Sequence, residues 1–311
     1  MQVYLDNNAT TRVALEVLEA MLPFFSNCYG NPSSMHSFGG QVGRAVTEAR
    51  EQVAELLGAE PEEIVFTSCG TESDSTAIFS ALQAFPEKRH IVTTRVEHPA
   101  VKNLCESLTH LTGHTHRVTR LMVEADGTLD LEAYKEALTE DTAIVSVMWA
   151  NNETGVLFPV EEMAALAKER GILFHTDAVQ AVGKIPVNLQ ENQIDVLSLS
   201  GHKLHAPKGV GVLYVRKGTP FVPFLHGGHQ EFQVAGPVHF LPDDALDLLQ
   251  HAPTERSPGV NASGELADHA GAHHQLVAGD FGIGGGFFGG VERELGDFHA
   301  RMFLMDLSAE L

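Results

Sequence analysis

A lysine follows a predicted buried strand at a position where its amine can react with an aldehyde. Lys203 ends the segment 200–203, which comes directly after the apolar run 196–199 and before the glycine-containing segment 207–211. Open α/β sheets bind their ligands at the carboxyl ends of strands. A lysine there, with small neighbours and a pKa lowered by desolvation, can form a Schiff base. The alternative is an ordinary solvated lysine.

An acidic residue occupies the same kind of position 26 residues earlier. Asp177 follows the apolar run 172–176, and Gln180 comes three residues later. A carboxylate so placed can keep a pyridine nitrogen protonated, which makes the ring an electron sink. If a helix begins here, Gln180 lies on the same side and can donate to a phenolic oxygen on that ring. The alternative role for Asp177 is a helix N-cap.

A turn of small and hydroxyl residues predicts a seat for phosphate. Residues 67–73 join the apolar run 64–67 to a segment with helical spacing. N–H groups at a helix start, together with the hydroxyls of Thr71 and Ser73, suit an anion. Both residues are also common caps that need no ligand.

Two further polar segments follow strands of the same predicted sheet. His98 comes after the run 91–94, so it can stack on a ring and transfer protons, or it can be structural. The segment 151–155, with Asn152, follows the run 143–148 and supplies amides, or simply forms a turn. Together the five motifs predict a pyridoxal 5'-phosphate site.

The elements that must position these residues alternate along the chain. Short apolar runs rich in Val and Ile alternate with amphipathic segments, which predicts an α/β fold with a mainly parallel sheet covered on both faces. The expected strands are 64–67, 91–94, 143–148, 172–176, 196–199 and 210–215, and the expected helices include 41–57, 131–138 and 161–170. We expect Gly58 to end the first helix and Asp130 to cap the second.

Composition excludes several classes of partner. With 20 Lys and Arg against 41 Asp and Glu, the 311-residue chain has a formal net charge of -21, which disfavours nucleic acid and anionic membranes. No segment offers the roughly 20 apolar residues of a membrane span, and no export signal is seen. Three scattered cysteines without metal spacing indicate a cytoplasmic protein, and no metal site is expected.

Over residues 3–231 the chain resembles the NifS-type cysteine desulfurases, which are fold-type I, class V aminotransferase-like homodimers. The resemblance is carried by the five motifs and by two further segments, residues 4–11 and 30–36. It implies conversion of L-cysteine to L-alanine, with sulfur passed as a persulfide to an iron-sulfur scaffold protein, as in nitrogen fixation. It implies two catalytic residues, Lys203 as the Schiff-base lysine and His98 against the ring. The implied cofactor-binding residues are Gly70, Thr71, His98, Asn152, Asp177, Gln180, Ser200, Gly201, His202 and Lys203, of which Thr71, Ser200 and His202 hold the phosphate.

After Glu231 the sequence changes character. Residues 232–311 contain no lysine and twelve glycines, so we expect a PLP-binding domain over 1–231 and an unassigned Gly/His-rich acidic tail without the family's small domain. The hypothesis is an out-of-frame or rearranged gene end. No cysteine follows Cys105, so the sulfur-accepting residue of the family has no counterpart and we expect little desulfurase turnover. The alternatives are another class V enzyme, such as a selenocysteine lyase or aminotransferase, and an inactive subunit.

Overall fold

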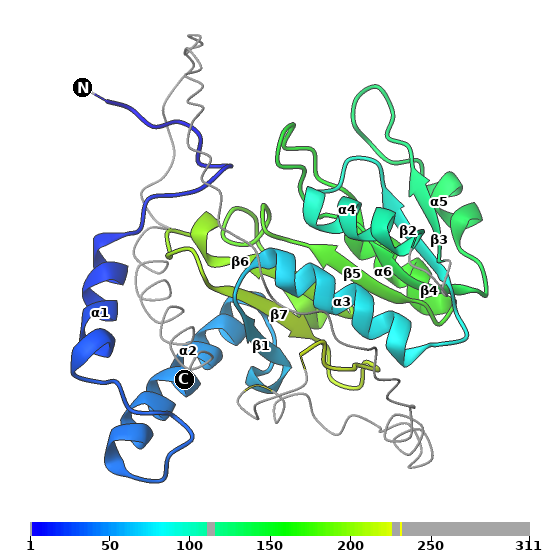
Figure 1. Ribbon diagram of the computed structural model, residues 1–311. Coiled ribbons are helices and arrows are strands. Elements are labelled where there is room, and N and C mark those ends of the chain that lie inside the picture. The colour runs from blue at the N-terminus through cyan, green and yellow to red at the C-terminus, as the bar shows by residue number, and fades with distance from the viewer. Residues whose placement is uncertain (1, 111–115, 226–230, 232–311) are drawn as a thin grey trace, which may run out of the picture. The chain divides into compact units, whose positions relative to one another are not determined.

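The protein is built on a seven-stranded sheet with the strand order β1-β7-β6-β5-β4-β2-β3 (Figure 1). The computed structural model describes residues 2–110, 116–225 and 231; the tail considered above lies outside these residues. The strands are β1 (Ile64–Thr67), β2 (His90–Thr94), β3 (Arg117–Leu121), β4 (Thr142–Ser146), β5 (Leu173–Asp177), β6 (Val196–Ser200) and β7 (Gly211–Val215).

The sheet is mainly parallel, as the sequence predicts. Strands β3, β2, β4, β5 and β6 pair in parallel, whereas β7 runs antiparallel to both β6 and β1. Every residue of β4, β5, β6 and β7 is buried, which explains their continuous apolar sequences. All six expected strands are present, with ends that differ by no more than two residues.

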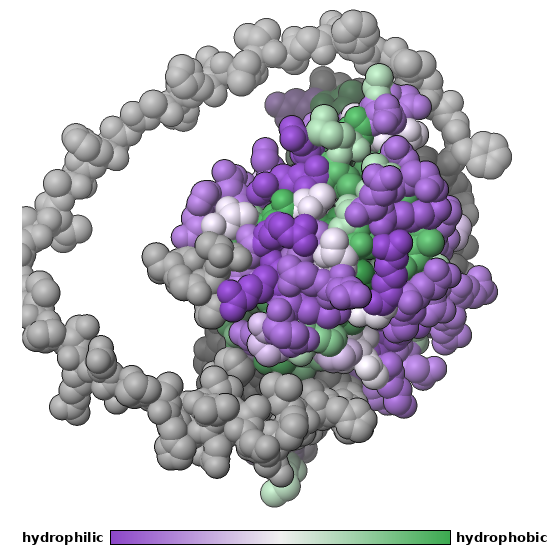
Figure 2. Space-filling model, turned by 90° about the vertical axis from the view of Figure 1, so that its right-hand side faces the viewer, coloured by the Kyte–Doolittle hydropathy of each residue, from purple (hydrophilic) through white to green (hydrophobic). Residues whose placement is uncertain are grey.

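The edge strand β3 was not predicted. Its sequence contains Arg117 and Arg120 and lacks a continuous apolar run, because only Leu121 of its five residues is buried. Charged side chains on an edge strand discourage pairing with another chain. Figure 2, which looks onto this side of the molecule, shows mainly hydrophilic side chains among smaller hydrophobic areas.

Helices cover both faces of the sheet. They are α1 (Leu15–Ser26), α2 (Ser37–Leu57), α3 (Gly70–Ala84), α4 (Pro99–Leu108), α5 (Leu131–Ala137) and α6 (Val160–Glu169). On β5, Leu173 packs in a cluster with residues of α3 and α4, while the next residue, Phe174, packs in a cluster with residues of α2, α5 and α6. This alternation places α3 and α4 on one face and the other three on the opposite face.

Local signals explain where the helices begin and end. The helix α2 starts four residues before the expected position because the His36 side chain accepts a hydrogen bond from Gly39 N, and it ends at Gly58 with a φ of 60°. Asp130 caps α5, as expected, by accepting from Glu132 N and Ala133 N. Among the described residues, no helix combines the length and the apolar character needed to cross a membrane.

Candidate functional site

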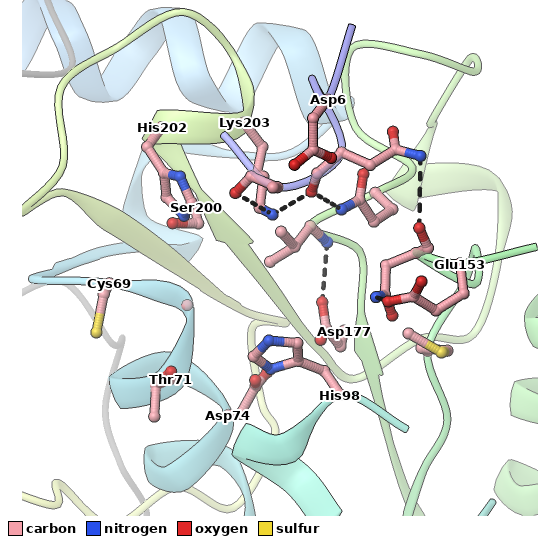
Figure 3. A pocket seen from close by; sticks show the side chains of 17 residues that line it. Asp6, Cys69, Thr71, Asp74, His98, Glu153, Asp177, Ser200, His202 and Lys203 are labelled. Carbon is pink, nitrogen blue, oxygen red and sulfur yellow. Dashed lines mark hydrogen bonds between the residues drawn. The ribbon is translucent and has the colours of Figure 1, made fainter. Parts of the chain in front are cut away.

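A cavity of about 370 Å³ opens at the carboxyl ends of β5 and β6 (Figure 3). The predicted site residues that line it are Gly70, Thr71, His98, Asn152, Asp177, Gln180, Ser200, His202 and Lys203. Gly201 does not line it; this residue is buried and donates its N–H to Val210 O at 3.0 Å. Residues that the motifs did not single out also line the cavity, among them Asp6, Asn8, Ala9 and Asp74.

Lys203 lies in a single 3-10 turn that directly follows β6. Its Nζ donates to the backbone carbonyls of Asn8 and Ala9, the latter at 2.8 Å. Burial lowers the pKa of this amine, while the nearby Asp177 and Asp6 oppose the shift. A lysine with a lowered pKa has a larger neutral fraction, and the neutral amine is the nucleophile.

Asp177 is the last residue of β5 and is buried at the base of the cavity. Burial raises the pKa of its carboxyl, and a hydrogen bond from Val179 N at 3.0 Å and the positive charges of His98 and Lys203 act in the other direction. The contact with Val179 is the cap-like bond weighed as an alternative. Turns and not a helix follow Asp177, so this bond closes a turn, and the pyridinium role stays a prediction.

Gln180 lies in a run of turns and not in the helix that the sequence suggested. Its Nε2 donates to Asn8 O at 2.8 Å, and its Oε1 accepts from Lys184. A lysine ammonium only donates and a carbonyl only accepts, so these two partners define the orientation of the amide. The Asn8 carbonyl accepts from both Gln180 and Lys203.

The start of α3 forms the opposite wall. This helix begins at Gly70, so the N–H groups of its first turn have no acceptor within the helix and face the cavity beside Thr71. A Cβ at Gly70 would lie 3.1 Å from Val179 Cγ2 and 3.4 Å from Ser200 Cβ, so glycine permits the close approach. Ser73 differs from the expectation, because its hydroxyl bonds Thr67 Oγ1 at 2.7 Å and Val212 O at 3.1 Å inside the core.

The remaining predicted residues border the cavity on other sides. His98 is exposed, and its Nδ1 accepts from Ala100 N at 3.2 Å, so it also caps α4. Asn152 donates to Glu153 Oε1 at 2.7 Å. Burial and the charge of Lys203 lower the pKa of His202, whose Nδ1 lies 3.1 Å from Thr10 Oγ1.

The sequence motifs did not predict two buried acids that lie in or near the cavity. Asp74 of α3 lines it, and Glu97 is buried beside it. Burial raises the pKa of Glu97 to about 8, against hydrogen bonds from Thr94 and Met148 that lower it. A signal for Asp74 was available, since it comes three residues after Thr71 and so shares its side of the helix.

The composition of the cavity fits pyridoxal phosphate. It brings together an amine with a lowered pKa, a buried carboxylate, and a helix start suited to phosphate. One buried carboxylate oxygen, Oδ1 of Asp74, has no hydrogen-bond partner among the described residues, as expected of a site that binds a polar ligand. The described residues contain no group of three His, Cys, Asp or Glu side chains that could hold a metal ion.

Comparison with known protein families gives the same assignment. A family model described as aminotransferase class-V matches residues 3–268. The chain belongs to the class-V aminotransferase family. The proteins of this family depend on pyridoxal phosphate. The match runs past Glu231, where the motifs indicated that the resemblance ends, and residues 232–268 lie outside the described part of the chain.

The relatives of this class-V protein are cysteine desulfurases. It is 64% identical over 230 residues to cysteine desulfurase NifS of Azotobacter vinelandii, covering 74% of the chain and 56% of that protein. It is 55% identical over 271 residues to cysteine desulfurase 2 of Trichormus variabilis, covering 87% of the chain and 63% of that protein. The chain thus spans less than two thirds of the length of these curated relatives.

Solved structures share the fold. A NifS-like protein superposes with a TM-score of 0.71 at 44% identity, over 76% of this chain and 64% of that one. The structure described as SspA in complex with cysteine also gives a TM-score of 0.71, at 39% identity, over 76% of this chain and 67% of that one. These matches confirm the predicted fold-type I architecture.

Proposed function

We propose that this protein is a pyridoxal-phosphate-dependent cysteine desulfurase whose cofactor is bound by residues 1–231. The observation that carries the proposal is a single cavity lined by Lys203, Asp177 and the start of α3. In this proposal residues 232–311, which lie outside the described residues, arise from an out-of-frame or rearranged gene end. Sequencing the gene across codon 231 and reading all frames tests that hypothesis.

The residues take roles that follow from their chemistry and position. Lys203 would carry the cofactor, and Asp177 would face the pyridine nitrogen. Gln180 would donate its amide to the phenolic oxygen, with Asn152 beside it. His98 would cover the ring, where its exposed imidazole can move a proton to or from the substrate. Thr71, Ser200 and His202 would hold the phosphate beside Gly70, whereas Gly201 is buried and does not line the cavity.

The bound cofactor supplies an electron sink that stabilises negative charge on the substrate's α-carbon. The chain contributes the groups that orient and move protons. When its amine is free, Lys203 is positioned by the Asn8 and Ala9 carbonyls, to which its Nζ donates. From there it can accept a proton from the substrate as a general base.

The proposed substrate is L-cysteine, and the products are L-alanine and a persulfide on an acceptor thiol. The carbon–sulfur bond breaks, the sulfur joins the acceptor sulfur, and the thiol proton remains with the alanine formed. The names of the relatives and the solved complex of SspA with cysteine support this substrate over selenocysteine or a transamination partner.

The proposed setting is a cytoplasmic homodimer that supplies sulfur to an iron-sulfur scaffold, as for nitrogenase. Many large apolar side chains are exposed between residues 3 and 38, including Leu5, Leu22, Phe25 and Met35, which supports burial by a second copy. The three cysteines are free, which suits a reducing compartment. The similarity to NifS of Azotobacter vinelandii supports the nitrogenase connection.

Cofactor binding is tested by titrating the purified chain with pyridoxal phosphate and recording visible absorbance. We expect a new absorbance band that is lost in Lys203→Ala and kept in Lys208→Ala, a matched exposed lysine that does not line the cavity. A band that survives in Lys203→Ala contradicts the assignment of the lysine, and the absence of any band contradicts the function.

The reaction is tested by adding L-cysteine together with a small thiol that can accept the sulfur. Without the added thiol we expect little turnover. With it, the expected products are alanine and the persulfide of that thiol, from which excess thiol releases sulfide as it is oxidised to the disulfide. A keto acid in place of alanine would indicate transamination, which the proposal excludes. Supplying the acceptor separates the chemistry at the cofactor from the question of which cysteine receives the sulfur.

A further inference from the structure

Asp74 is a buried acid in the wall of the cavity with an oxygen that lacks a hydrogen-bond partner. It lies in α3, its exposed fraction is 1%, and its Oδ1 has no partner among the described residues. The nearest basic atom is Nε2 of His175, at 3.6 Å. Figure 3 shows Asp74 on α3 and Asp177 at the end of β5, on either side of the His98 ring in this view, and all three line the cavity. A buried carboxylate with an unbonded oxygen is costly, whereas a carboxylic acid is not.

The basic neighbour of Asp74 already has other partners. His175 is fully buried in β5, and its two ring nitrogens each lie 2.9 Å from a hydroxyl, Ser146 Oγ on one side and Ser198 Oγ on the other. Burial lowers the pKa of this imidazole to about 3, so the ring is neutral. His175 therefore supplies no positive charge to balance an ionised Asp74.

Two more buried acids lie near Asp74. Asp177 accepts from Val179 N and has the positive charge of Lys203 nearby, and Glu97 accepts from Thr94 Oγ1 at 2.6 Å and from Met148 N. Like charges in neighbouring buried sites do not all ionise, so the acid with the poorest set of donors is the first to be protonated. Of the three, only Asp74 has a fully buried oxygen without a hydrogen-bond partner among the described residues.

We propose that Asp74 is a neutral positioning acid, which leaves the negative charge of the cavity on Asp177, where the cofactor nitrogen would meet it. The consequence for the cofactor nitrogen rests on the proposed function, whereas the protonation state of Asp74 can be tested without it. The charged and titratable groups facing Asp74 are Asp177 and His175 from β5, Glu97 after β2, and Cys69 on its own element. Burial first, and then Asp177, raise the pKa of Asp74 well above its ordinary range, and a hydrogen bond with the Ser198 side chain acts in the other direction.

The protonation state can be measured without cofactor. The full chain is labelled with aspartate carrying carbon-13 in the carboxyl group, and its carbon NMR spectrum is followed from pH 5 to 8. We expect one aspartate signal to stay in the protonated range at pH 7. That signal should disappear in Asp74→Asn and persist in Asp130→Asn, an exposed control.

Each outcome decides the proposal. Ionisation of all aspartates at pH 7, or loss of the protonated signal in Asp177→Asn with retention in Asp74→Asn, would overturn it. If Asp74→Asn fails to fold, persistence of the signal in Asp177→Asn supports Asp74, and its loss there overturns the assignment. Failure of the chain to bind cofactor defeats the proposed function and leaves this result standing.

Cofactor affinity tests the positioning role. Asparagine keeps a neutral donor, so Asp74→Asn should bind pyridoxal phosphate within about threefold of the parent, with the same pH midpoint of visible absorbance. Asp74→Leu removes the donor, and we expect affinity to fall about tenfold. A midpoint shift of a pH unit or more in Asp74→Asn, or unchanged affinity in Asp74→Leu, would contradict the role.

Discussion

Two groups of polar residues in this protein differ in how completely the chain itself satisfies their hydrogen bonds. Arg50 of α2 donates to both carboxylate oxygens of Glu231 at 2.9 and 3.0 Å, bonds the carbonyl of Ile64, and lies 4.7 Å above the Phe66 ring. Glu231 in turn accepts from Phe66 N at 2.9 Å. In the cavity, by contrast, Asp74 keeps an unbonded oxygen.

This difference in hydrogen bonding distinguishes residues that stabilise the fold from residues that can bind a ligand. A charged group whose partners all come from the chain stabilises the fold and has no free hydrogen-bonding position for a ligand. Charges with displaced pKa values and missing partners, as at Asp74, Asp177 and Lys203, are typical of functional sites. Substitutions should therefore affect stability in the first region and cofactor affinity in the second.

The largest expected effect is on stability, in Arg50→Ala. Removing one partner of this partly buried ion pair leaves Glu231 uncompensated and should cost about 3 kcal/mol, the lower end of the range for buried pairs. Urea unfolding measures the loss, with Arg117→Ala as the control, because that arginine forms an exposed pair with Asp141 worth about 0–1 kcal/mol. An equal loss in the free energy of unfolding in the two variants would contradict a special structural role for Arg50.

The next effect is on cofactor affinity, in Asp177→Asn. Losing the charged partner of a buried pyridinium should cost about 2 kcal/mol or more, about thirtyfold in Kd, with little loss of stability. The matched control is Asp195→Asn, a buried acid that accepts from Phe174 N at 3.0 Å and pairs with Lys168. Fluorescence titration with cofactor should leave that control unchanged, and a similar loss of affinity in both variants would contradict the assignment.

A pH dependence of stability is expected from Glu97. Its folded pKa of about 8 lies above its ordinary value of 4.5, so the folded protein binds the extra proton between these values. This contribution to stability is complete below pH 4.5 and is lost as the pH rises through 8, with a slope of up to about 1.4 kcal/mol per pH unit.

Glu97→Gln removes that slope, because glutamine does not titrate. The measurement is the free energy of unfolding of both proteins at several pH values from 5 to 9, and the difference between them isolates Glu97 from other groups. Parallel curves would show that Glu97 is ionised throughout and that the cavity holds one more negative charge than proposed.

The smallest effect is expected at a surface helix cap. Asp130→Ala removes the acceptor for Glu132 N and Ala133 N and should cost about 1 kcal/mol in thermal or urea unfolding. Cofactor absorbance should not change. Glu136→Ala, an exposed position of the same helix, serves as the control and should stay within about 0.5 kcal/mol of the parent.

The sequence predicts the fold well where every residue of a strand is buried, and less well in segments with polar, solvent-exposed residues. Fully buried strands such as β5 and β6 have unbroken apolar runs, and their ends locate Asp177 and Lys203. The edge strand β3 lacks that pattern because solvent reaches most of its residues. Gln180 lies in turns and not at a helix start. The sequence could not predict this, because local spacing does not distinguish a helix start from successive turns.

Other features of the site are not predicted by the five motifs. The carbonyls of Asn8 and Ala9 bond Lys203 across more than 190 residues, and any residue type carries such a carbonyl. Ser73 faces the core because β7 lies against that side of α3, a tertiary fact that cap preferences do not include. Asp74 lies one residue beyond the motif that indicated the phosphate seat.

The central claim is that the amine of Lys203 bonds the cofactor. Reduction of the cofactor-loaded chain with borohydride, followed by digestion and mass spectrometry, locates the modified lysine. We predict that the label is found on Lys203 alone and is absent from Lys203→Ala. Label on Lys184 or Lys208, or no stable label after reduction, would contradict the account.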